Sequence, residues 1–212
     1  QRFSIKRKKK LLQMAKAQGW LIIENVSDVD YHYGGPHTHS LYQLDPHHHV
    51  IQLSRFDALP SIVSLGLFLG PPRLVEDLER YHYYLYPQKN FLLERLIAME
   101  ISEGIIGARL RRTLPVYRHR RQKVYEALVH YFSHDIDFYM PSYGLGLWIQ
   151  FRQRISMHQF LEKCHTKGLY IPAELVYQDY RYCGLRIGFS DLEEASIDPI
   201  FALLYEAYME LL

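Results

Sequence analysis

Segments with the periodicity of helices and segments with the character of strands alternate along the whole of this chain. Residues Ile5–Gln18 intersperse apolar with basic side chains, and Gly19 follows as a natural helix stop. The continuous apolar run Trp20–Ile23 is typical of a strand buried on both faces. Two further strands are predicted at His49–Leu53 and Val63–Leu69. This alternation predicts an α/β or α+β fold.

The second half of the chain continues the pattern with shorter elements. Pro71 and Pro72 close the third strand and open a helix with Leu74, Leu78 and Tyr81 at helical spacing. Further helices are predicted at about Asn90–Ser102, Ile105–Phe132, Met157–Thr166 and Asp191–Leu212, and strands at Gly144–Phe151, Leu169–Ile171 and Leu185–Phe189. Pro115 is expected to interrupt or kink its helix. We expect two lobes that meet in the helix around 105–132.

The composition is that of a globular protein. The 212 residues, 48% hydrophobic and 23% charged, suffice for one large domain or two small ones. Two cysteines exclude a disulfide scaffold. No apolar run approaches the roughly 20 residues that cross a bilayer, and the N-terminus carries no signal-peptide pattern. We therefore expect a cytoplasmic protein.

Basic residues are concentrated in two stretches. Six of the 25 lie within the first ten residues, and a second group runs from Arg109 to Lys123. Lys6–Lys10 could contact DNA phosphates, although a solvated helix face is the simpler interpretation. Arg109–Lys123 is interpreted as the exposed side of a long helix that buries Leu110, Leu114, Tyr117 and Val124. With a net charge of +2, neither stretch makes the chain a polyanion binder.

Several motifs follow one another in the order and spacing of one known family. They are Arg7–Leu12, Gly19–Glu24, Tyr31–Pro36, Leu41–Asp45, Val50-Ile51, Leu65–Leu67, Leu69–Pro71, Gly144–Leu147 and Gly184–Phe189. Together they resemble the aminotransferase-like domain of MocR-type regulators, a branch of the GntR transcription factors. Those proteins join a winged helix-turn-helix to a fold-type-I pyridoxal-phosphate domain.

The resemblance covers essentially the whole chain but only the second half of that domain. It implies an α/β, fold-type-I aminotransferase-like fold, with a partial large lobe that has a mixed sheet and a small α+β C-terminal lobe. Residues 1–104 would form the second half of the large lobe. Residues 105–212 would form the long connecting helix and the small lobe. The chain is expected to be a fragment of a longer protein or a truncated relative.

Two residues after the first strand depart from the family pattern. The family has Ile-Ile-Glu-Asp-Asp-Tyr-Asp where this chain has Ile22–Asp28. The family Asp that faces the pyridine nitrogen falls on Asn25, which is neutral and cannot keep that nitrogen protonated. The family Tyr that bonds the ring hydroxyl falls on Ser27, which is too short to reach the same point.

The position of the cofactor-binding lysine departs as well. Counting back from Gly66 places the family Arg on Ser64 and the family Lys on Asp57, and the chain has no lysine at all from Ala17 to Gln88. Without an amine no covalent cofactor link can form. The resemblance thus implies degenerate cofactor positions at Asn25, Ser27, Asp57 and Ser64, no bound pyridoxal phosphate and no catalytic residue.

Arg186 is the one retained candidate of the family site. In related aminotransferases an Arg on the corresponding strand holds the substrate carboxylate through a bidentate pair, so the resemblance implies a carboxylate ligand here. The alternative is a strand Arg paired with a structural Asp or Glu.

Three other clusters have simpler interpretations. The histidines at His37, His39 and His47–His49 invite a metal site, but they lack ligand spacing, so no specific metal is predicted. The aromatic segment Tyr81–Tyr86 is interpreted as a dimer surface. Cys164, in a helix, and Cys183, at a strand start, are expected to be inert because neither has an electropositive context.

The sequence therefore predicts a regulatory module. The resemblance implies an effector-binding and dimerisation domain of a MocR-type regulator, a homodimer without aminotransferase activity. It would contact DNA only through a winged helix-turn-helix that these residues do not include. Two alternatives stay open: a pyridoxal-phosphate-dependent aminotransferase, and a dimerisation scaffold that binds no ligand.

Overall fold

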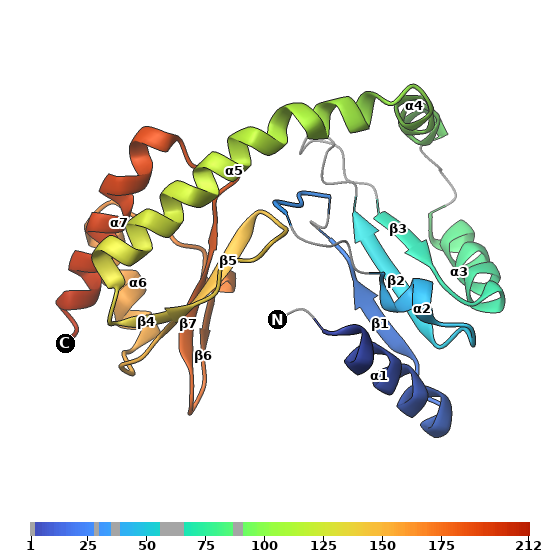
Figure 1. Cartoon of the computed structure of the whole chain (residues 1–212), viewed down its shortest axis with the longest axis horizontal. Helices are drawn as coiled ribbons and strands as arrows, with labels where there is room; N and C mark the ends of the chain where they lie inside the picture. The colour runs from blue at the N-terminus through green and yellow to red at the C-terminus, as the bar shows by residue number, and fades with distance from the viewer. Residues whose placement is uncertain (1–2, 28–29, 35–38, 56–65, 87–90) are drawn as a thin grey trace. The chain divides into compact units, whose positions relative to one another are not determined.

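A computed structural model describes residues 3–27, 30–34, 39–55, 66–86 and 91–212. The chain divides into two compact units, Gln1–Arg112 and Thr113–Leu212. Each unit has its own β-sheet (Figure 1). None of the helices in the described part of the chain combines the length and hydropathy that a bilayer crossing requires.

The first unit contains a three-stranded mixed sheet. Strand β1 (Ile22–Asn25) runs parallel to β2 (Val50–Arg55), and β2 pairs antiparallel with β3 (Gly66–Leu69). Helices α1 (Ile5–Gln18) and α2 (Leu41–Leu44) cover one face of this sheet, where Leu12, Leu41 and Val50 form a buried cluster. The mixed sheet is the one that the sequence predicts.

Local sequence signals account for the limits of α1. Ser4 caps its N-terminus, because its side-chain oxygen accepts a hydrogen bond from the Arg7 backbone N–H at 3.3 Å. Gly19 ends the helix in the left-handed conformation, at φ 66°, which a side chain would disfavour. The predicted helix Ile5–Gln18 and its stop are therefore confirmed.

Strand β1 differs from its prediction. It begins at Ile22 rather than Trp20, and burial alternates along it instead of being continuous. Ile22 contacts the buried cluster, whereas the Ile23 side chain is 65% exposed. The prediction of burial on both faces is wrong because successive side chains point to opposite faces and helices α1 and α2 cover one of them.

Two helices complete the first unit. Helix α3 (Pro72–Leu85) has proline at its first position, as the sequence predicts, and has no buried residue. Helix α4 (Phe91–Ser102) buries only Ile97. Both helices therefore leave most of their apolar side chains accessible to solvent.

The second unit is an antiparallel sheet covered by helices on one face. The strands lie in the order β4 (Ile136–Phe138), β5 (Gly146–Phe151), β7 (Cys183–Gly188), β6 (Val176–Gln178). Helices α5 (Ile105–Phe132), α6 (Met157–Thr166) and α7 (Glu194–Met209) supply the cover. Phe151 of β5 meets Phe132, Phe160 and Tyr208, one from each helix, with ring centroids 5.1–6.5 Å apart. This aromatic core binds the sheet to all three helices.

The structure differs from two expectations about the second half. Helix α5 is not interrupted at Pro115 but continues to Phe132. A kink at this residue stays a prediction. The buried side chains of Val124, Ala127 and Leu128 then hold its C-terminal half in place. Leu169–Ile171 forms no strand, because the place beside β7 is taken by β6, which pairs through Gln178 and Cys183.

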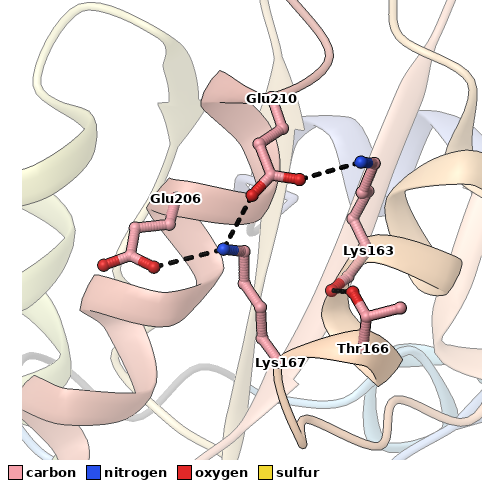
Figure 2. Close-up of polar contacts among 5 residues, drawn as sticks. All are labelled: Lys163, Thr166, Lys167, Glu206 and Glu210. Carbon is pink, nitrogen blue, oxygen red and sulfur yellow. Dashed lines mark hydrogen bonds and ion pairs between the residues drawn. The ribbon is translucent and has the colours of Figure 1, made fainter.

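Helices α6 and α7 are joined at the surface by a four-residue ion-pair network (Figure 2). The Lys167 ammonium lies 3.2 Å from the Glu206 carboxylate and 2.8 Å from that of Glu210. Lys163 lies 2.9 Å from the other oxygen of Glu210. The two lysines lower the pKa of Glu210 to about 2, and both carboxylates raise the pKa of Lys167.

Candidate functional site

The first two candidate residues lie together at the C-terminal end of β1. The side-chain oxygen of Asn25 accepts hydrogen bonds from the Ser27 backbone N–H at 3.0 Å and from its hydroxyl at 2.7 Å. The backbone N–H of Val26 donates to Leu53 of β2 at 2.8 Å, so the sheet ladder extends to the start of this turn. Asn25 and Ser27 therefore form a local turn at the edge where the parallel strands end.

This arrangement does not fit the ring of pyridoxal phosphate as the family pattern does. The Asn25 side chain is an uncharged amide, and its oxygen already accepts two hydrogen bonds from Ser27. A cofactor ring nitrogen stays protonated only beside a negative charge. The other two degenerate positions, Asp57 and Ser64, lie outside the described residues. The sequence itself has no lysine between Ala17 and Gln88.

The Glu24 side chain of β1 bonds to the backbone at the start of α2. Its carboxylate oxygens accept hydrogen bonds from the backbone N–H groups of Leu41, at 2.8 Å, and Tyr42, at 3.1 Å. Glu24 thereby links β1 to the start of α2, where Ser40 and Gln43 form a capping box. From the sequence, Glu24 is identified only as the last residue of the motif Gly19–Glu24. In the structure its carboxylate has a structural role, because it connects β1 to α2.

Arg186 lies in the second unit, on the sheet face opposite the helices. It is exposed, and it lies directly across from Trp148 in the register of β5 and β7. Its guanidinium extends over Gly146, where an added Cβ would come within 3.4 Å of Cζ and Nη2. Asn25 and Ser27 belong to the first unit, and Arg186 belongs to the second.

Sequence reasoning missed the aromatic residues beside Arg186. Trp148 and Tyr177 lie on the same face, 40% and 51% exposed, with ring centroids 6.3 Å apart in a T-shaped contact. The available signal was the alternation of Gly146, Trp148 and Gln150 along β5, which places these side chains on the face opposite Leu147, Ile149 and Phe151.

The Tyr177 side chain is held by the neighbouring hairpin turn. Its hydroxyl donates a hydrogen bond to Asp179 at 3.0 Å, which raises the pKa of Tyr177. The backbone N–H groups of Tyr182 and Arg181 donate to the same carboxylate and lower the pKa of Asp179. Asp179 is thus the centre of the turn between β6 and β7.

The histidine turn before β2 is organised by Asp45. Its carboxylate accepts hydrogen bonds from the backbone N–H groups of His47, His49 and Val50 at 2.5–2.9 Å. The Lys16 ammonium lies 3.1 Å from Nε2 of His47. Within the ranges that the structure describes, no three His, Cys, Asp or Glu side chains are placed to hold a metal ion. His37 lies outside these ranges.

The cysteines lie where the sequence predicts. Cys164 is buried in α6 and Cys183 is buried at the start of β7. Burial raises the pKa of Cys164 to about 12, only partly opposed by the charge of Lys167, so its thiolate is scarce at neutral pH. Lys6–Lys10 forms a largely solvated face of α1. The second basic stretch agrees with its prediction only in part, because Val124 is buried whereas Leu110, Leu114 and Tyr117 are half-buried.

The chain is similar in sequence both to aminotransferases and to regulators. It is 31% identical over 190 residues to an uncharacterized aminotransferase of Saccharolobus solfataricus, covering 86% of this chain and 46% of that protein. It is 27% identical over 199 residues to an uncharacterized HTH-type transcriptional regulator of Bacillus subtilis, covering 92% and 42%. The chain spans about half the length of the curated relatives it matches. No family model matches it.

Solved structures show the fold. The kynurenine aminotransferase of Pyrococcus horikoshii superposes with a TM-score of 0.89 at 19% identity, over 98% of this chain and 52% of that one. The α-aminoadipate aminotransferase LysN of Thermus thermophilus, solved with N-(5′-phosphopyridoxyl)-L-leucine, superposes with a TM-score of 0.85 at 19% identity, over 98% and 55%. The predicted α/β fold-type-I aminotransferase-like architecture, covering roughly the C-terminal half of such chains, is confirmed.

Proposed function

We propose that this chain is the effector-binding and dimerisation part of a MocR-type transcriptional regulator, without aminotransferase activity. The observation that carries the proposal is the neutral turn at the end of β1. Asn25 takes the place of the carboxylate that the resemblance expects opposite the pyridine nitrogen, and its oxygen is bonded to Ser27. The lack of lysine from Ala17 to Gln88 supports the same conclusion.

Regulation requires that a ligand bind one conformation better than another. Arg186 presents an exposed guanidinium suited to a carboxylate, and such a contact needs no covalent chemistry. The similarity to the Bacillus subtilis regulator over 92% of this chain supports a regulatory setting. The DNA-binding module would then lie outside these 212 residues.

A pyridoxal-phosphate-dependent aminotransferase is the second candidate. The 31% identity to the Saccharolobus solfataricus aminotransferase favours it, and an aromatic-amino-acid aminotransferase of Thermococcus litoralis is also similar, at 22% identity over 209 residues. This candidate requires an amine that Asp57 does not supply.

A cofactor titration separates the two candidates. Pyridoxal phosphate is added at stoichiometric concentration to the purified chain, followed by absorbance spectroscopy, borohydride reduction and peptide mass mapping. We expect no reducible adduct at a defined lysine. The Asn25→Asp/Asp57→Lys double variant is the matched control, in which we expect an adduct at position 57. A single stoichiometric adduct on a lysine of the unmodified chain would overturn the proposal.

A further inference from the structure

Helix α1, dark blue in Figure 1, presents a row of lysines to solvent. The row consists of four exposed side chains, Lys6, Lys9, Lys10 and Lys16. At 3.6 residues per turn they lie within about 120° of one another around the helix axis. The buried side chains of Leu12 and Ala15 lie outside this sector. The lysine row is therefore a solvent-facing surface on a helix that the core holds in place.

Within the part of the chain that the structure describes, no carboxylate pairs with the lysine row. The Lys16 ammonium lies 3.1 Å from Nε2 of His47, and the adjoining Lys8 donates to the His39 carbonyl at 2.7 Å. Neither partner is an anion. Arg7, beside the row, is exposed as well. These neighbours therefore leave the positive charge of the row uncompensated.

The sequence concentrates positive charge around this helix. From Gln1 to Ile23 there are seven Lys or Arg residues and no Asp or Glu. All 23 acidic residues of the chain come later, so the rest of the chain is net negative. The net charge of +2 thus combines two regions of opposite sign. The local field rather than the net charge attracts a polyanion to one face.

We propose that the lysine row binds the phosphate backbone of double-stranded DNA without sequence preference. From Lys6 to Lys16 the row extends over about 15 Å of helix axis. B-DNA carries one phosphate charge per about 1.7 Å of its own axis, so a phosphate lies within reach of each ammonium group. A lysine ammonium is a point charge on a flexible stem, which suits phosphates in many orientations and conveys no base sequence.

Two other anionic partners fit this surface less well. An anionic membrane binds helices with a continuous apolar face. In α1, Leu11 and Leu12 pack into the buried cluster, and Ile5 and Met14 lie on opposite flanks of the row. An acidic protein would need aromatic or apolar anchors, because lysine is depleted at the centres of protein interfaces. The row itself has no aromatic member.

This inference goes beyond the proposed function. In a MocR-type regulator the lysine row would add a sequence-independent contact to that of the winged helix-turn-helix. The contact uses neither a cofactor nor an effector. A pyridoxal-phosphate adduct in the cofactor titration would therefore remove the regulator proposal and leave the test of the lysine row unchanged.

Fluorescence anisotropy with a labelled duplex of about 20 bp measures the binding, because a duplex of this length offers far more phosphates than the row can contact. We expect a dissociation constant of about 1–10 μM at about 25 mM NaCl, and about 100-fold weaker binding at about 100 mM, as four phosphate contacts predict. A second duplex of unrelated sequence should bind within about twofold of the first.

Matched double variants locate the surface. Lys6→Gln/Lys10→Gln keeps good helix formers but removes two phosphate contacts. It should weaken binding at least about tenfold at about 25 mM NaCl and reduce the salt slope by about 2. The control Arg111→Gln/Arg112→Gln removes the same charge from exposed positions of α5. It should stay within about twofold of the parent, with an unchanged slope. Melting temperatures verify that both variants fold.

Several results would overturn the inference. They are no binding at low salt, an unchanged salt slope in Lys6→Gln/Lys10→Gln, and equal weakening in the two double variants. Tighter binding of phosphatidylserine vesicles or of polyglutamate than of the duplex would also overturn it, and would assign the lysine row to a membrane or to an acidic protein. Loss of affinity and of salt slope in the lysine variant alone would support it.

Discussion

At the scale of single residues, burial makes Cys164 a chemically silent thiol. The side chain is fully buried in α6, and its pKa of about 12 leaves almost no thiolate at neutral pH. In the Cys183→Ser variant we expect no reaction of Cys164 with Ellman's reagent at pH 8, and one thiol per chain after unfolding in guanidinium. Labelling of the folded variant at the rate of a free cysteine would contradict this assignment.

The candidate site could be predicted from residue chemistry but not from residue contacts. That Asn25 is neutral and that lysine is missing over 17–88 follow from the letters alone. The hydrogen bonds from Ser27 to Asn25 depend on the turn geometry, and sequence spacing does not give them. Trp148 escaped notice for the same reason. The Trp148 ring lies over the backbone of Gly184, and this contact becomes visible only once the strand register is known.

At the scale of elements, aromatic packing between helices and sheet dominates the second unit. Phe132 of α5 is fully buried and meets Phe151, Tyr205 and Tyr208. Phe132→Ala should lower the free energy of unfolding by about 3–5 kcal/mol, through lost burial and the cavity left behind. Tyr139→Ala, at an exposed position, should change it by less than about 0.5 kcal/mol. Chemical denaturation measures both, and similar losses in the two variants would refute this account of the core.

The network between α6 and α7 makes stability depend on pH. The pKa of Glu210 in the folded chain is about 2, below its ordinary value of 4.5. Its contribution to stability is therefore present above about pH 4.5 and is lost as the pH falls towards 2. Glu210→Gln should lower the melting temperature at pH 7, and its difference from the parent should shrink steadily below pH 4.5. A difference that stays constant from pH 7 to pH 3 would exclude the network as its source.

The sequence predicts helices and strands correctly where local signals are strong. It misses strands that form only because they pair with another strand. Helix α1 has a serine cap and a glycine stop, and α6 matches its predicted range from Ser156 as the cap. Strand β4 has three residues, too few to establish a period, and it exists because Ile136–Phe138 pairs with β5. β6 likewise depends on its hairpin with β7. Propensity along the chain contains no information about such partners.

At the scale of the whole molecule, helices α3 and α4 leave many large apolar side chains exposed. Among the described residues of α3 and α4 only Ile97 is buried. Tyr84 is 81% exposed and Leu92 is 79% exposed, and further large apolar side chains accompany them on both helices. Exposed apolar surfaces of this kind mark association sites. A two-fold dimer would bury the same patch on both partners.

Self-association through α3 and α4 can therefore be tested on the intact chain. We predict a dimer by sedimentation velocity at micromolar concentration, and a shift to monomer in the Leu92→Glu/Leu96→Glu variant, because two buried charges without partners would oppose the interface. Tyr170→Glu is the matched control: Tyr170 is as exposed as Tyr84 but lies in the second unit. This control should leave the dimer intact. A chain that stays monomeric at about 100 μM, well above the midpoint of a micromolar dimer, would remove dimerisation from the proposed function.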